Sequence, residues 1–287
     1  MPLQQLVEYF NDRLEWEHHS NFRPFFLKEG VVHGLFGPIR IGTDLVALRK
    51  VSNPSVIAGF SARLGVTTTE IPHLQKHELE QVLSLPARQS INPDSIVDFD
   101  RLARTVHMLN FLPFAHEQEF LQLEVDPRHI LGVKKDHGAY FQEVILKCGL
   151  EPKNIVITLG INSVYAPYYD TLLEGLENYR RRGYRIALKF DYQALDGSAM
   201  ALVSRLAPDF ICFSAAHFET LQDNTLLEKL KGLTALVRKI AAQSIIFQVD
   251  GRKTAGIARQ TGFDLALGEY YALQEAKSFV AGVRKAG

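Results

Sequence analysis

Features that mark several common protein classes are scarce in this chain of 287 residues. The two cysteines, Cys148 and Cys212, lack a metal-type spacing, and their apolar sequence context predicts buried thiols in a reducing compartment. No apolar run approaches the roughly 18 residues that a membrane span needs. The 32 basic and 32 acidic residues cancel, so bulk charge favours neither a nucleic-acid partner nor a membrane surface. We therefore expect a cytoplasmic protein, or a fragment of a cytoplasmic multidomain protein.

Familiar catalytic motifs are also missing. No Gly-rich phosphate loop follows any expected strand, which disfavours an open dinucleotide-binding sheet. The histidines show neither HxH nor HExxH spacing, and Ser198 and Ser214 have no readable His/Asp constellation. The N-terminal segment 1–19 is charged and amphipathic, which predicts a helix and not a signal peptide. We also expect no cofactor.

From residue 118 onward, short apolar or β-branched runs alternate with longer amphipathic ones. Gly149, Gly183 and Gly262 stand where helix C-caps are expected. Runs such as IVITLG and IIFQV are nearly all apolar, as strands buried on both faces should be. This alternation predicts repeated βα units with a parallel sheet. The expected strands are 120–126, 154–160, 185–190, 210–214, 245–249 and 265–268.

The N-terminal part has a different pattern. FRPFFL (22–27) and VVHGLFGPIRIG (31–42) are joined by a tight Lys28-Glu29-Gly30 turn, which predicts an antiparallel hairpin. With these two runs the strand total is about eight, and the length suits one closed βα barrel over 1–287. Residues 43–97 look irregular and partly inserted, with helices expected over 53–64 and 73–85 at one end of the barrel.

Eight short segments, in the same order and at similar spacing, resemble the EAL domain, the bacterial phosphodiesterase of cyclic di-GMP. HGLFGPIR resembles GxEALLRW, LEVDPRHI resembles NLSPRQL, GLEPKNIVITLG resembles GLxPERLELEITE, and TGFDLALG resembles LGCDLVQG. The resemblance covers nearly the whole chain apart from about half of 43–97. It implies an α/β fold, a modified TIM (βα)8 barrel of EAL type with an antiparallel first hairpin.

The same resemblance implies that the family's chemistry is lost. EAL enzymes hydrolyse a phosphodiester through water activated by two divalent cations, which carboxylates and an asparagine hold at the carboxyl ends of the strands. At the corresponding positions this chain has Phe36, Glu124, Thr158, Ile161, Lys189, Phe190, Cys212, Ser214, Phe247 and Leu267. Among the acidic positions Asp250 survives, and Asp191 or Asp196 could occupy one more.

We therefore expect no enzyme activity, no metal and no catalytic residue. The leading hypothesis is a non-catalytic EAL-like signalling domain that acts by protein–protein interaction, with 43–97 as a candidate partner surface. A second hypothesis is a cyclic di-GMP receptor without hydrolysis, in which Arg40 has the position of a phosphate contact. A third is a barrel enzyme of another class that uses Lys189 with nearby carboxylates. The carboxylates considered are Glu124, Asp126, Asp191, Asp250 and Glu269.

Overall fold

Eight strands pair into a closed ring in the computed structural model, which describes residues 2–19, 21–68, 93–115, 119–133, 138–190, 197–216, 218 and 225–272. Seven of the strands, β4 to β10, run parallel to their neighbours, and β3 lies antiparallel between β4 and β10. The strands are β3 (Ile39–Lys50), β4 (Ile57–Thr68), β5 (Phe120–Val125), β6 (Ile155–Ile161), β7 (Arg185–Phe190), β8 (Phe210–Ser214), β9 (Gln243–Phe247) and β10 (Leu265–Ala266). The predicted α/β barrel is confirmed.

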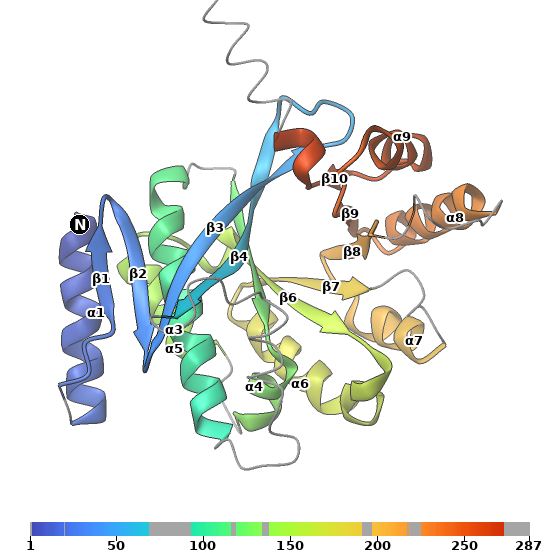
Figure 1. Cartoon of the computed structure of the whole chain (residues 1–287). Helices are drawn as coiled ribbons and strands as arrows, with labels where there is room; N and C mark the ends of the chain where they lie inside the picture. The colour runs from blue at the N-terminus through green and yellow to red at the C-terminus, as the bar shows by residue number, and fades with distance from the viewer. Residues whose placement is uncertain are drawn as a thin grey trace, which may run out of the picture.

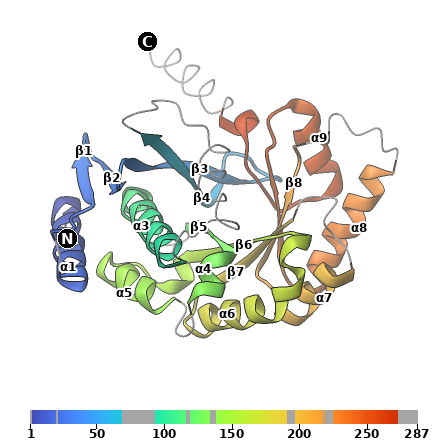
Figure 2. The ribbon, with the colours of Figure 1, turned by 60° about the horizontal axis from the view of Figure 1, so that its bottom comes forward.

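Helices surround the ring on its outside (Figure 1, Figure 2). They are α3 (Pro93–Phe111), α4 (Pro127–Gly132), α5 (Ala139–Lys147), α6 (Tyr169–Arg181), α7 (Gly197–Leu206), α8 (Leu226–Lys239) and α9 (Arg252–Thr261), with short 3-10 turns η2 (Leu112–Phe114), η3 (Pro152–Asn154) and η4 (Ser163–Tyr168). Gly149, Gly183 and Gly262 have positive φ after helices, as predicted. None of the described helices is long and apolar enough to cross a membrane.

The predicted antiparallel first hairpin exists, but it lies outside the ring, so the prediction that counts its two strands among the eight barrel strands is wrong. β1 (Phe25–Lys28) and β2 (Val31–Phe36) pair antiparallel around the Glu29–Gly30 turn, where both residues have positive φ as a type I′ turn requires. β2 then pairs with only the first residues of β3. The antiparallel strand inside the ring is β3. The predicted strand 31–42 ends at residue 42, whereas β3 continues to Lys50.

The helix predicted over 53–64 is also wrong, because β4 occupies most of that range. Phe60, Ala62, Leu64 and Val66 alternate with less apolar residues, and this period of two lets one face of β4 pack against the main core. The expected insertion at 43–97 therefore contains two barrel strands. The helix predicted over 73–85 lies outside the described residues.

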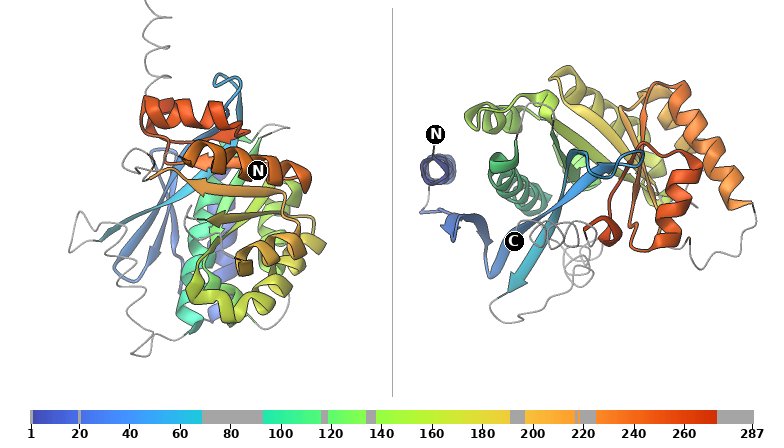
Figure 3. Two further views of the ribbon diagram at one scale, coloured as in Figure 1. Left: turned by 90° about the vertical axis from the view of Figure 1, so that its right-hand side faces the viewer. Right: turned by 90° about the horizontal axis from the view of Figure 1, so that it is seen from above.

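An N-terminal extension of the sheet is fixed by two amide side chains. The Asn110 side chain of α3 accepts a hydrogen bond from the Val32 amide and donates one to the Val32 carbonyl, at 2.8 Å each. Asn11 of α1 (Leu3–His18) bonds the carbonyl and amide of Phe25 at 2.7 and 2.9 Å. α3 therefore packs against β2 and β3, while α1 lies against β1 (Figure 3).

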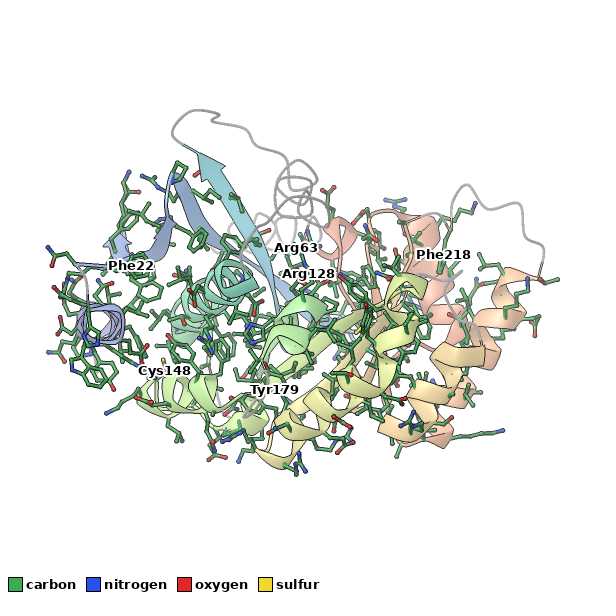
Figure 4. The ribbon with its side chains drawn as sticks, turned by 90° about the horizontal axis from the view of Figure 1, so that it is seen from below. Phe22, Arg63, Arg128, Cys148, Tyr179 and Phe218 are labelled. Atoms are coloured by element: carbon green, nitrogen blue, oxygen red, sulfur yellow. The ribbon has the colours of Figure 1, made fainter. Side chains whose placement is uncertain are left out.

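A buried charge network joins α3 to α4 and α6. The Arg104 side chain is 1% exposed and donates to the carboxylate of Asp100, to His129 at 3.1 Å and to the hydroxyl of Tyr179 at 3.2 Å. Burial alone would raise the pKa of Asp100, but the Arg104 charge and the His129 contact lower it. Figure 4 places Tyr179 on α6 at this junction. Such a network is costly to break, because one lost partner leaves a buried charge.

We predict that Gly59→Ala destabilises the barrel. A Cβ at Gly59 would lie 2.5 Å from the Phe120 carbonyl oxygen, at the start of the β4–β5 pairing. We expect a loss of about 2–3 kcal/mol in the free energy of unfolding, measured by urea titration. Gly232→Ala in α8 is the matched control, because its Cβ meets open space and should stabilise by about 0.5–1 kcal/mol. A Gly59→Ala protein as stable as the wild type would contradict the close approach.

A second prediction concerns His107, whose imidazole is buried 2.7 Å from the Thr43 hydroxyl. Burial lowers the pKa of His107 to about 4, while the Asp100 charge opposes and the Arg104 charge adds to that shift. Between pH 6.5 and 4 the unfolded chain binds the extra proton, so stability falls as the pH falls, by up to about 1.4 kcal/mol per pH unit. Chemical denaturation of His107→Gln across this range should show a shallower loss. Equal pH dependence of the two proteins would refute this account.

Candidate functional site

Three predicted positions meet at the carboxyl ends of the strands. The Lys189 Nζ of β7 donates to the Glu124 Oε2 of β5 at 3.0 Å and lies 4.8 Å from the ring centroid of Phe247 on β9. Phe120, Ala187 and Ile245 line the barrel interior on the same three strands. Because side chains alternate along a strand, Glu124, Lys189 and Phe247 also point inward. They form a contact across the mouth of the barrel, joining strands that are not neighbours.

The Lys189–Glu124 ion pair is partly open to solvent. Its side chains are 29% and 51% exposed, so the pair contributes at most about 1 kcal/mol to stability. The ion pair matters more for the charge at the barrel mouth than for stability. The lysine neutralises the carboxylate and places an ammonium group at the mouth of the barrel.

The layer beneath the ion pair is neutral. Gln122 of β5 donates to the Cys212 Sγ of β8 at 3.3 Å, and burial raises the pKa of this thiol to about 12. Thr158 of β6 is 2% exposed, and its hydroxyl has no hydrogen-bond partner within the described parts of the chain. In the described part of the mouth, Glu124 is the carboxylate that contacts Lys189, and thiol, amide and hydroxyl groups lie in the layer below.

Two other candidate carboxylates serve as caps of loops and helices. Asp126 accepts from the Arg128 amide at 2.8 Å as the N-cap of α4, and it pairs with the Arg128 guanidinium, labelled in Figure 4. Asp250 accepts from the Glu269 amide at 2.9 Å. Of the carboxylates named for a lysine-based enzyme, only Glu124 contacts Lys189 in the described regions. Asp191 and Asp196 lie outside the described residues.

A residue of unusual backbone conformation stands at the end of β9. Gln248 has φ of +61°, a region that costs a non-glycine residue of order 1 kcal/mol or more. Its side-chain oxygen accepts a hydrogen bond from the Ser214 hydroxyl, which in turn accepts from the Ala216 amide at 3.2 Å. This contact joins the ends of β8 and β9 beside Phe247.

Phe36 and Arg40 are not brought to this mouth. Phe36 ends β2, outside the ring, and its ring meets Phe99 of α3 edge-on at 5.5 Å, so the position at the barrel mouth that the resemblance implied for Phe36 is wrong. Arg40 is exposed on β3, with its guanidinium 5.4 Å from the Phe26 ring centroid. No described contact joins Arg40 to Glu124 or Lys189.

The barrel strand that sequence reasoning missed is β4. It reads IAGFSARLGVTT, and Gly59, Ala62 and Leu64 match the GxEALL pattern better than 33–40 does. Ser61 then has the position of the motif's glutamate, and it lies opposite Gln122 of β5 in the barrel. The glycine of the pattern was the usable signal, because Gly59 must lie against the Phe120 carbonyl.

Solved structures with this architecture belong to EAL-domain proteins. Klebsiella pneumoniae BlrP1 in a manganese and cyclic di-GMP complex at pH 6 is 16% identical over 82% of this chain and 55% of its own, with a TM-score of 0.64. Bacillus subtilis YkuI, an EAL-domain protein in complex with cyclic di-GMP and calcium, is 16% identical over 79% of this chain and 54% of its own, with a TM-score of 0.61. The EAL enzyme Bd1971, cAMP bound form, is 11% identical over 93% and 67%, with a TM-score of 0.58.

The chain therefore has the EAL-type barrel fold. It spans about half the length of BlrP1 and YkuI. No family model and no curated protein matches the sequence. At these identities the likeness shows the fold alone.

We predict that both thiols are unreactive in the folded protein. Burial raises the pKa of Cys148 and of Cys212 to about 12, so little thiolate forms at pH 8. A thiol-reactive chromogenic disulfide should label the native chain slowly and both cysteines after denaturation. The variant Cys148→Ala assigns any residual reaction, and rapid labelling of Cys212 in that variant would show that the floor of the mouth is open.

Proposed function

We propose that this chain is a non-catalytic EAL-fold signalling domain that acts by binding a protein partner. The Lys189–Glu124 ion pair at the barrel mouth supports this proposal most directly. Two-cation hydrolysis needs several hard oxygen ligands around one site. Ser61, Thr158 and Lys189 stand at positions where the resemblance implies carboxylates. Among the described residues at the compared positions, Glu124 and Asp250 carry a carboxylate, and Asp250 accepts from the Glu269 amide.

Electrostatics oppose a divalent cation at Glu124. An ammonium group about 4 Å from a doubly charged ion costs from about 2 kcal/mol in bulk water to about 8 kcal/mol at a dielectric constant of about 20. One carboxylate, already bonded to that ammonium, does not offset this. Among the described residues, no group of three His, Cys, Asp or Glu side chains is placed to hold a metal ion. The described residues of the mouth do not fit the metal pair that the resemblance implies.

Binding of cyclic di-GMP without turnover is the second candidate. The cyclic di-GMP complexes of BlrP1 and YkuI have the same fold. Lys189 supplies a cation and Phe247 an aromatic face at the mouth, a combination suited to a phosphate and a base. Calorimetry with the nucleotide, with and without Mg²⁺, separates this candidate from the first, because a protein-binding domain should give no heat.

A lysine-based enzyme remains the third hypothesis. It needs a free amine at Lys189, whereas this amine is held between Glu124 and Phe247. Trapping with an aldehyde and borohydride would test it, since a Schiff base requires that amine.

The prediction for the leading proposal concerns turnover. Wild type and Glu124→Gln should both show no hydrolysis of cyclic di-GMP above the buffer rate, with Mg²⁺ or Mn²⁺, in a chromatographic assay of the linear product. Lys189→Gln removes the competing charge and should still show none, because Ser61 and Thr158 supply no carboxylate. Metal-dependent turnover by the wild type that is lost in Glu124→Gln would overturn the proposal.

A further inference from the structure

One face of the N-terminal sheet carries aromatic, apolar and cationic side chains toward solvent. Directly opposite residues in antiparallel strands share a face, and the register pairs Phe26 with His33, Lys28 with Val31, and Leu35 with Arg40. Side chains at every second position of β2 point the same way. The outer face, as we call it, consists of Phe26, Lys28, Val31, His33, Leu35 and Arg40.

The opposite face of these strands is already covered. Val32 and Ile41 are fully buried, and a Cβ at Gly34 would lie 3.1 Å from Val106 of α3. On the outer face, in contrast, Val31 and Leu35 are each 41% exposed. A sheet with apolar side chains on both faces is normally covered on both, and large exposed apolar residues beside cations mark interaction surfaces.

Ring contacts order the polar side chains of the outer face. The Phe26 and His33 rings stack at 5.3 Å with 25° between their planes, and the Arg40 guanidinium lies over Phe26. Lys28 and Arg40 have no ion-pair partner in the described segments. Stacked arginine and aromatic side chains lose little entropy on binding and are frequent at the centres of interfaces.

We infer that the outer face binds an amphipathic helix of a partner protein, with acidic residues flanking its apolar stripe. Leucine-like side chains would contact Val31 and Leu35, and carboxylates would pair with Lys28 and Arg40. The partner helix would cover the sheet as α3 covers the other face. This inference rests on the proposed role of the chain as a binding domain and assigns that role to a surface distinct from Glu124 and Lys189.

Anisotropy titration with two labelled synthetic helices tests the inference. One peptide carries a leucine stripe at i, i+3 and i+4 spacing flanked by glutamates, and the other has lysine in place of every glutamate. The glutamate peptide should bind the wild type, and the lysine peptide should not. Leu35→Glu and Arg40→Glu should each weaken binding about tenfold or more. Leu236→Glu on α8 and Arg259→Glu on α9, both at exposed positions, should change it by less than about twofold.

His33 supplies an independent readout. Burial, the Arg40 charge and the Lys28 charge lower the pKa of His33 in the free chain, while Glu29 opposes them. A glutamate bound beside Arg40 favours the imidazolium, so the pKa of His33 should rise on binding and the affinity should increase as the pH falls toward 6. An NMR titration of the His33 ring measures this shift.

Three results would overturn the inference. They are absence of glutamate-peptide binding up to about 100 μM, equal binding of both peptides, and unchanged affinity in folded Leu35→Glu and Arg40→Glu proteins. Circular dichroism and the urea midpoint show whether each variant is folded. Any of these results with hydrolysis still absent refutes this surface alone, whereas metal-dependent turnover refutes the proposed function and leaves the surface result standing.

Discussion

The pairing of one antiparallel strand with two parallel ones closes this barrel, and every other feature depends on it. β3 pairs with β4 over eleven of its residues and with β10 at its far end, so it joins the first and last parallel strands. Closure then sets the side-chain alternation of β5, β7 and β9, which brings Glu124, Lys189 and Phe247 into contact. β3 and β4 extend beyond the ring, and this extension gives β2 a strand to pair with. The barrel mouth and the outer face therefore follow from a single hairpin.

The parallel half of the fold could be predicted from the sequence because its signals are strong. Nearly apolar runs such as 155–161 and 245–249 are typical of strands buried on both faces, and glycines of positive φ follow three helices. The strand prediction for the N-terminal part was wrong because two hairpins in the sequence could each supply the first barrel strands. Both 25–36 and 39–68 alternate, and a tight turn with Glu29 and Gly30 is a stronger local signal than the longer 51–56 connection. Only the pairing with β5 and β10 distinguishes a barrel strand from an added one.

The candidate site was predicted where strand and motif coincide. Glu124, Thr158, Lys189, Cys212 and Phe247 all lie on the strands to which the resemblance assigned them. Phe36 lies in the hairpin before the one that enters the barrel. In the comparison with the EAL motif, Ser61 therefore takes the glutamate position that the sequence interpretation assigned to Phe36. Ser61 at this position supports the proposal that the metal pair is lost, since a serine hydroxyl is a weaker ligand than a carboxylate for a hard cation. The outer face was not visible in the sequence, because its residues are spread over three strands and depend on the register.

The central proposal is that a lysine–carboxylate contact takes the place for which the resemblance to the EAL domain implies metal ligands. The most direct measurement is a crystal structure of the chain soaked with Mn²⁺ and cyclic di-GMP, with an anomalous difference map at the barrel mouth. This account predicts no anomalous peak near Glu124 and Thr158, with the Lys189 Nζ still within hydrogen-bond distance of Glu124. A manganese peak ligated by Glu124, with Lys189 turned away, would contradict it.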